Sequence, residues 1–213
     1  MKSLYYLAIL FSLNTLQAQT VSTVSGSGVA GVLNGTGTAA RHHFPGSVVV
    51  DSLGNLYTSD YLGNTIRKIT PAGVVTTFAG SGAAGSADGT GTAASFYFPW
   101  GMAIDGSGNI IVADQGNHKI RKITMAGIVT TIAGSGALGS ANGAAAGASF
   151  NKPTDVTVDA AGNIYIADQW NDMVRKLSTA GIVSTLAGSG AGGWADGPGA
   201  TAQFNRPSGI ALD

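Results

Sequence analysis

The chain has 213 residues, of which 33 are Gly and none is Cys or Glu. Its 11 Lys and Arg residues balance 11 Asp residues, so no excess charge favours nucleic acid or an anionic membrane as a partner. Without Cys the chain has neither a disulfide framework nor a thiolate metal site, and abundant Gly without Glu favours short strands and turns over helices.

The first 18 residues differ in composition from the rest of the chain. Lys2 supplies a positive charge, residues 4–11 are apolar, and Leu16-Gln17-Ala18 resembles a signal-peptidase site, although Leu16 is larger than usual there. We therefore expect residues 1–18 to be a secretory signal peptide. A buried or amphipathic first helix is the alternative, and the apolar run is too short for a membrane span. The mature chain is expected to be exported, with a periplasmic, cell-surface or secreted location and no membrane span.

The rest of the chain repeats itself with a period of 54 residues, as the spacing of Asp51, Asp105 and Asp159 illustrates. The copies occupy residues 20–73, 74–127, 128–181 and, cut short, 182–213. A fixed period of this order is typical of solenoids and propellers, in which each repeat is one structural unit.

Each copy contains four runs that predict β-strands. In the second copy they are Gly101–Asp105, Ile110–Ala113, Lys119–Ile123 and Ile128–Ala133. The second run is apolar on both faces, as expected of a strand covered on both sides, and a turn ending in Gly108-Asn109 precedes it. Four antiparallel strands that cannot cover their own faces predict an all-β propeller blade that stacks on its neighbours.

The run D-x-x-G-N-I-x-V-A-D-x-x-N-x-x-I-R-K, from Asp105 to Lys122, resembles the NHL repeat, including the Asn117-His118 pair. The preceding A-G-S-G-x-x-G-x-x-D-G and A-x-F-x-x-P blocks are similar to the long-insert NHL repeats of exported bacterial and cell-surface proteins. The resemblance extends over about residues 20–213 and implies a β-propeller, commonly of six blades. The first copy departs most, because His42-His43 replaces Phe96-Tyr97.

Counting strands predicts about three complete blades, at residues 46–80, 100–134 and 154–188. Thr20–Ser25 is expected to be a lone fourth strand and Gly209–Asp213 a lone first strand. Propellers close with about four to eight blades. We therefore expect an open three-bladed arc of a larger ring in a truncated sequence, with closure by self-association as the alternative.

Two charged positions recur in every complete copy. An acidic residue ends the second strand and an arginine follows seven residues later: Asp60, Asp114, Asp168, Arg67, Arg121 and Arg175. These residues could form a ring of ligand-binding charges. The preferred interpretation is a structural one, in which each Asp holds its own loop and each Arg packs its stem and pairs locally.

The sequence predicts neither a metal nor a cofactor. The loops at Asp88-Gly89 and Asn142-Gly143 carry at most one acidic side chain each, whereas calcium takes about six to eight oxygen ligands. His42 and His43 are adjacent, with no acidic residue nearby in sequence. The A-G-S-G segments lack the Lys-Ser/Thr of a phosphate-binding loop, no G-x-S-x-G nucleophile motif is present, and no helix is expected.

The residues that break the repeat are the most informative about function. We expect a ligand-binding face to contain Tyr61, Tyr97, Trp100, Asp155, Trp170 and Trp194. Most lie between blades or after the second strand, in loops that open on one face of a propeller. Exposed aromatic rings suit sugars or protein partners, although these Trp rings could instead cover gaps between blades.

Two functions remain open. The first is a non-catalytic, extracytoplasmic scaffold or binding module for a protein or glycan. The alternative is a fragment of an exported propeller lyase or lactonase whose metal ligands lie beyond the C-terminus. The resemblance implies that such enzymes place Glu, Asp and His around a central tunnel, and this sequence contains no Glu.

Overall fold

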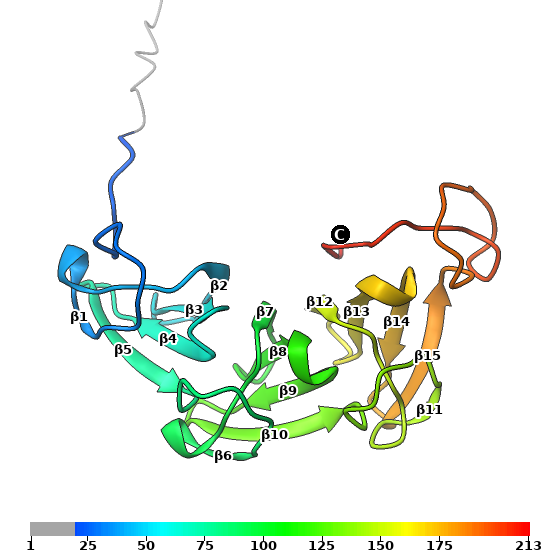
Figure 1. The fold of residues 1–213 in the computed structure, drawn as a ribbon, viewed down its shortest axis with the longest axis horizontal. Helices are drawn as coiled ribbons and strands as arrows, with labels where there is room; N and C mark the ends of the chain where they lie inside the picture. Colours follow the sequence, from blue (N-terminus) through cyan, green and yellow to red (C-terminus); the bar gives the residue numbers. More distant parts are fainter. Residues whose placement is uncertain (1–19) are drawn as a thin grey trace, which may run out of the picture.

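The computed structural model describes residues 20–213, so the predicted signal peptide lies outside the described residues. Three five-stranded antiparallel sheets stand side by side in an open arc (Figure 1). Blade 1 contains β1 (Gly35–Thr36), β2 (Pro45–Val50), β3 (Leu56–Asp60), β4 (Thr65–Ile69) and β5 (Val74–Ala79). Blade 2 contains β6 (Gly89–Thr90), β7 (Pro99–Ile104), β8 (Ile110–Asp114), β9 (Lys119–Ile123) and β10 (Ile128–Ala133). Blade 3 contains β11 (Gly143–Ala144), β12 (Pro153–Val158), β13 (Ile164–Asp168), β14 (Met173–Leu177) and β15 (Ile182–Ala187).

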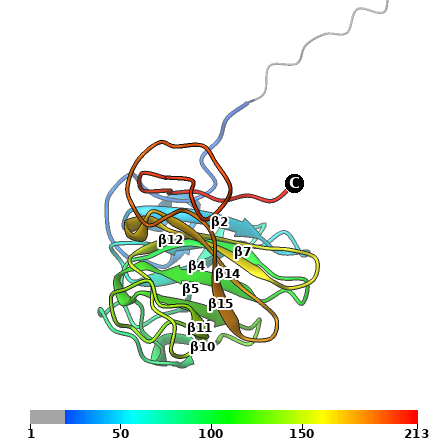
Figure 2. The same cartoon turned by 90° about the vertical axis from the view of Figure 1, so that its right-hand side faces the viewer.

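The strand order is the same in every blade. In blade 2 it runs β6-β10-β9-β8-β7. The inner strands β2, β7 and β12 lie toward the centre of the arc, and the outer strands lie toward its rim (Figure 2). The structure therefore confirms the all-β propeller architecture and the open arc of three blades.

The turn between the first two strands of each blade follows from its Asp and Gly residues. In blade 1 the Asp51 carboxylate accepts hydrogen bonds from the backbone N–H groups of Leu53 and Asn55, each at 2.9 Å. Gly54 has a φ of +80°, a conformation that costs Gly little. The hairpin register then pairs Val50 with Leu56.

Four details of the sequence prediction are wrong. Each blade has a fifth, two-residue strand, because residues such as Gly89-Thr90 pair with the outer strand. Residues 20–25 and 209–213 form no strand, because neither segment is in a ladder with a neighbouring strand. The first strand of each blade begins about two residues earlier than expected, at the proline.

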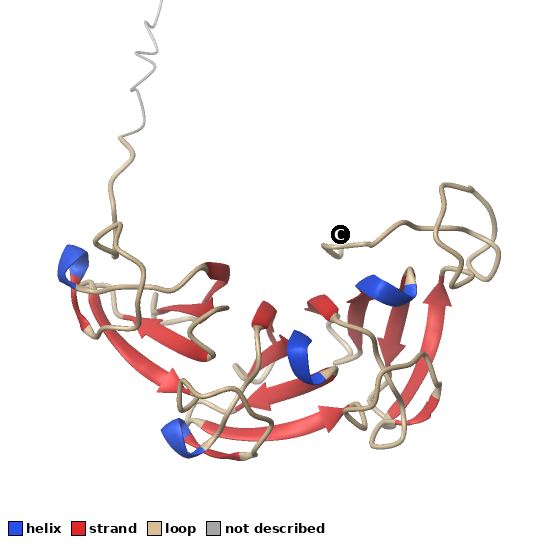
Figure 3. Cartoon of the chain, viewed as in Figure 1, coloured by secondary structure: helices blue, strands red, loops and turns tan. Residues whose placement is uncertain are grey.

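Short 3-10 helices also occur, contrary to the expectation of none (Figure 3). They are η1 (Gly37–Ala39), η2 (Gly91–Ala93), η3 (Gln115–Asn117) and η4 (Gln169–Asn171). Each is a single tight turn of three residues, which forms where a loop closes locally. Among residues 20–213 no helix is long and apolar enough to cross a membrane.

The apolar core lies between blades. One cluster joins Tyr57, Ile66 and Ala79 of blade 1 to Phe96 and Met102 of blade 2, and a second joins blades 2 and 3 in the same way. Phe96 is fully buried, and burying a side chain of this size contributes about 1.5–3 kcal/mol. The stacking of neighbouring blades is therefore the main source of apolar burial in this arc.

Candidate functional site

The loops after the second strand and the segments before the first strand meet at one end of the blades. Backbone hydrogen bonds join them in every blade: Tyr61 N–H to Phe44 C=O (3.1 Å), Gly116 N–H to Tyr97 C=O (2.8 Å) and Trp170 N–H to Asn151 C=O (3.0 Å). We call this end the loop face. It consists of residues 43–46, 61–64, 97–100, 115–118, 151–154 and 169–172.

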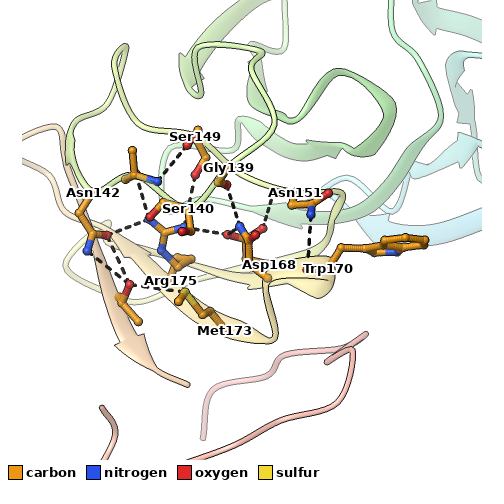
Figure 4. A network of polar contacts seen from close by, with 12 residues as sticks. Gly139, Ser140, Asn142, Ser149, Asn151, Asp168, Trp170, Met173 and Arg175 are labelled. Carbon is orange, nitrogen blue, oxygen red and sulfur yellow. Dashed lines mark hydrogen bonds and ion pairs between the residues drawn. The ribbon is translucent and has the colours of Figure 1, made fainter. Parts of the chain in front are cut away.

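A buried ion pair lies beneath each part of the loop face. The distances between guanidinium nitrogen and carboxylate oxygen are 3.0 Å for Arg67–Asp60 and 2.7 Å for Arg121–Asp114 and Arg175–Asp168. All six side chains are fully buried. Figure 4 shows the third pair, in which Arg175 also donates to the carbonyl oxygens of Ser140 and Ser149.

Each aspartate of blades 2 and 3 also organises the loop above it. The Asp114 carboxylate accepts the Tyr97 N–H at 2.9 Å and the Asn117 side-chain amide at 2.8 Å. Burial raises the pKa of the Asp114 carboxyl, while these hydrogen bonds and the charge of Arg121 act in the opposite direction. Asp168 has equivalent partners in Asn151 and Asn171. With all their polar contacts directed inward, these pairs position the loop face without reaching it.

Blade 1 has a different arrangement, because His42 occupies the position of Phe96. The His42 ring lies 3.2 Å from the Asp60 carboxylate and 3.0 Å from the Ser25 hydroxyl. The sequence analysis missed this acidic partner because Asp60 is distant along the chain. Hydroxyl, imidazole and carboxylate are in the order of a nucleophilic triad.

The environment of this relay favours a packing role. The Asp60 carboxylate is already paired with Arg67, which reduces its ability to stabilise a protonated imidazole. The residues equivalent to Ser25 and His42 in the next copy are Ala79 and Phe96, which belong to one apolar core cluster. We therefore interpret the Ser25–His42 contact as a polar replacement for that apolar contact.

A second set of hydrogen bonds connects neighbouring blades on the loop face. The acceptors are Asn64 Oδ1, His118 Nδ1 and Asp172 Oδ1, which receive the N–H groups of Phe98, Lys152 and Arg206 at 2.9, 3.0 and 2.7 Å. All six of these residues have φ between 51° and 55°. The sequence analysis missed this connection, although its two positions recur every 54 residues and one always precedes proline.

Three of the predicted ligand-face residues meet in one aromatic cluster. The Tyr61 ring stacks on Phe98 with a centroid distance of 4.7 Å and packs edge-on against Trp100 at 4.8 Å. Tyr97 stacks on Phe98 at 4.2 Å, and Phe44 lies within 6.0 Å of both Tyr61 and Trp100. Phe44 is 56% exposed and Tyr97 37% exposed, so the cluster offers ring surface to solvent at the junction of blades 1 and 2.

The other three predicted residues lie apart from this cluster. Trp170 is exposed and contacts Lys152 and Arg206, whose charged groups lie 4.3 and 4.7 Å from its ring centroid. Trp194 is 87% exposed and makes no ring or cation contact among residues 20–213.

Asp155 lies in the inner strand β12. Its carboxylate accepts the N–H groups of Val156 and Ile210, each at 3.0 Å, and burial raises its pKa. A Cβ atom at Gly101 would collide with Asp155, so the carboxylate packs closely against the inner strand of blade 2.

Comparison with known proteins identifies the repeat. Residues 96–123 match the NHL repeat family model, over a segment that contains β7, β8 and β9. The chain is an NHL-repeat protein. NHL repeat-containing protein 2 of Gallus gallus is 36% identical over 95 residues, which are 44% of this chain and 13% of that protein.

Two further comparisons bear on the NHL arc. A probable peptidyl-alpha-hydroxyglycine alpha-amidating lyase of Caenorhabditis elegans is 35% identical over 89 residues, or 40% of this chain and 24% of the lyase. An auxiliary nutrient binding protein of Bacteroides ovatus has a similar fold, with a TM-score of 0.63 and 21% identity, over 83% of this chain and 44% of that one. The chain spans only 9–24% of the length of the curated relatives it matches.

The described part of the NHL arc brings together no group of three or more His or Asp side chains that could hold a metal ion. The repeated aspartates are each engaged by arginine, and Asp155 stands alone on its strand. The chemistry that the loop face offers is therefore contact through aromatic rings and through the cations beside Trp170.

Proposed function

We propose that this NHL arc is a non-catalytic, extracytoplasmic binding module that takes a protein or glycan partner on its loop face. The observation that carries the proposal is the aromatic cluster, in which five rings from two blades pack together while Phe44 and Tyr97 stay open to solvent. Aromatic side chains give large contact areas at a small cost in conformational entropy, and they dominate many binding surfaces.

The framework beneath the cluster suits a binding role. The Tyr97 N–H is held by the Asp114 carboxylate and the Phe98 N–H by Asn64, so hydrogen bonds orient the backbone that carries these rings. A surface ordered before binding loses less entropy when a partner docks. Rigid blades with variable loop residues are therefore a reasonable platform for recognition.

The extracytoplasmic part of the proposal rests on the N-terminal sequence pattern. Expression of the full chain in a bacterial host, followed by mass spectrometry of the exported protein, tests it. A mature N-terminus at Gln19 is the expected result. Retention of Met1 in a cytoplasmic product would contradict export.

The binding role is tested with a variant of the loop face. Phe44→Asn, Tyr97→Ser and Trp170→Ser remove three exposed rings, and Asn suits the positive φ of position 44. The matched control is Leu53→Ser with Met125→Ser, which removes exposed apolar side chains from turns at the opposite end of the blades.

Both variants and the wild type are applied to a glycan array and to immobilised extracellular proteins. Loss of a binding hot spot typically costs about 2 kcal/mol, or roughly 30-fold in affinity. We expect that loss in the loop-face variant alone. Equal loss in the control, or unchanged binding in the loop-face variant, would contradict the proposal.

The second candidate function is a lyase or lactonase whose metal ligands lie outside these residues. The specific observation in its favour is the 35% identity to the Caenorhabditis elegans lyase over 89 residues. Metal-dependent cleavage of a peptidyl-α-hydroxyglycine by the full chain would favour this candidate. Absence of cleavage together with ligand capture on the loop face would favour the binding module.

A further inference from the structure

The residue before the first-strand proline has the same unusual backbone conformation in all four copies. Phe44, Phe98, Lys152 and Arg206 have φ values of 61°, 55°, 51° and 54°. Positive φ is uncommon outside Gly and a clear outlier for bulky side chains. Such a conformation persists only where the surroundings impose it, and it concentrates at functional sites. We call these four residues the pre-proline row.

The surroundings fix the backbone of this row and leave its side chains free to differ. The N–H groups of Phe98, Lys152 and Arg206 donate to Asn64, His118 and Asp172 of the preceding blade. None of these bonds involves the side chain of the row residue. The row therefore places one variable side chain per blade at an equivalent point of the loop face.

The chemistry of the row changes from one end to the other. In blade 1 the Tyr61 ring lies between Phe44 and Phe98, with centroid distances of 5.9 and 4.7 Å. In blade 3 the Trp170 ring contacts both Lys152 and Arg206. Each end thus consists of two row residues and one ring from the intervening loop, and the ends differ in charge.

The two cations are available to a ligand. Among residues 20–213, no carboxylate lies within 4.0 Å of the charged group of Lys152 or Arg206. Arg206 is exposed and Lys152 is half-buried. The pKa of His118 is lowered by burial and also by the charge of Lys152, so the positive charge acts on the loop face itself.

We propose that the pre-proline row binds an acidic oligosaccharide, with sugar rings against the aromatic end and uronate carboxylates at Lys152 and Arg206. This inference rests on the proposed function and names its ligand class. A uronic acid presents a C–H face for ring contact and a carboxylate for charge-assisted hydrogen bonds on one unit, which matches the mixed row. Single-stranded nucleic acid fits less well, because it needs a positive groove along its whole length.

The probes are hexameric oligomers of galacturonate, mannuronate and guluronate, together with fully methyl-esterified hexagalacturonate. The ester keeps the sugar rings and removes the charge. Affinities for the full chain are measured by isothermal titration calorimetry at low and high salt. A single-stranded RNA oligomer and an Asp-rich peptide serve as competing ligand classes.

The variants separate charge from folding. Lys152→Asn with Arg206→Asn removes both cations and retains a residue that tolerates the positive φ. Lys152→Arg is the conservative variant. Lys176→Asn is the matched control, because Lys176 lies over the Tyr165 ring in the same blade, towards the end opposite the loop face.

We expect at least one uronate oligomer to bind, with about tenfold weaker binding after esterification or in the double Asn variant. Lys152→Arg and Lys176→Asn should bind as the wild type does. Absence of binding to all three uronates, equal binding of the ester, or preference for RNA or the acidic peptide would overturn the inference. Failure of the proposed function is distinguishable, because there the loop-face ring variant loses no partner of any class.

Discussion

The buried arginines carry most of the polar organisation within each blade. Arg121 donates to the Asp114 and Asp88 carboxylates and to the carbonyl oxygens of Ser95 and Ala87. Only its Nε has no partner among the described residues. The arginine therefore joins the middle strand to the long connection that precedes the blade. Such a network requires its charge to stay compensated, since an unpaired buried charge is costly.

The two aspartates that contact Arg121 should differ strongly in their effect on stability. Asp114→Asn leaves the buried guanidinium without its buried counter-ion, for an expected loss of about 3–5 kcal/mol in the free energy of unfolding. Asp88→Asn removes a carboxylate that is 49% exposed, for an expected loss of less than about 1 kcal/mol. Urea unfolding followed by circular dichroism measures both. Equal losses would contradict the framework interpretation of Asp114.

The sequence predicted the chemistry of the repeated Asp and Arg residues better than that of the variable ones. Identity at equivalent positions indicates a contact that every blade needs, and Asp114–Arg121 has that geometry. The aromatic cluster was only partly predicted, because Phe44 and Phe98 resemble ordinary core residues in sequence. The positive φ that brings them to the loop face leaves no local signal except the following proline.

At the scale of elements, each blade is connected to the next through its loops as well as its core. His118 accepts the Lys152 N–H through Nδ1, whereas Asn64 performs this role at the preceding junction. A protonated imidazole has no acceptor, so the bond requires neutral His118.

This junction predicts a pH dependence. Burial and the charge of Lys152 lower the pKa of His118 below its ordinary 6.5. The unfolded chain then binds the proton more tightly, so stability is complete above about pH 6.5 and falls as the pH drops through the lowered pKa. His118→Asn should remove this component while keeping an acceptor and a residue that tolerates positive φ. Unfolding midpoints between pH 8 and 5 test it, and the same pH slope in both proteins would contradict it.

At the scale of the whole molecule, the open arc leaves one face of blade 1 uncovered. The same strand position is occupied by Val48, Met102 and Val156, which are 61%, 5% and 2% exposed. Blades 2 and 3 each have a preceding blade that covers this position, and blade 1 has none among residues 20–213. Exposure at equivalent positions thus reports directly on stacking.

Two matched substitutions test the arc in solution. Val156→Ala deletes buried methyl groups and should cost about 1–3 kcal/mol, whereas Val48→Ala should change stability by less than about 0.5 kcal/mol. Chemical unfolding at several protein concentrations measures both. A cost at Val48 that equals the cost at Val156, or that grows with concentration, would show that another blade covers this face.

The period of 54 residues predicted blades, strands and the arc, because stacking imposes the same contacts on each copy. It did not predict the fifth strand, since two-residue ladders depend on how the connection folds back on the outer strand. It misassigned the end segments, which have strand-like sequences without a neighbouring ladder. Periodicity thus predicts what the blades share, and it leaves open the tertiary contacts of individual segments.

The most direct test of the account is hydrogen exchange of the full chain with and without the strongest ligand from the binding panel. The account predicts slower exchange in peptides that contain residues 43–46, 61–64, 97–100, 151–154 and 169–172, which form the loop face. The turns at 51–55, 105–109 and 159–163 should exchange unchanged. Protection of those turns, with none on the loop face, would contradict the claim that this protein recognises its partner there.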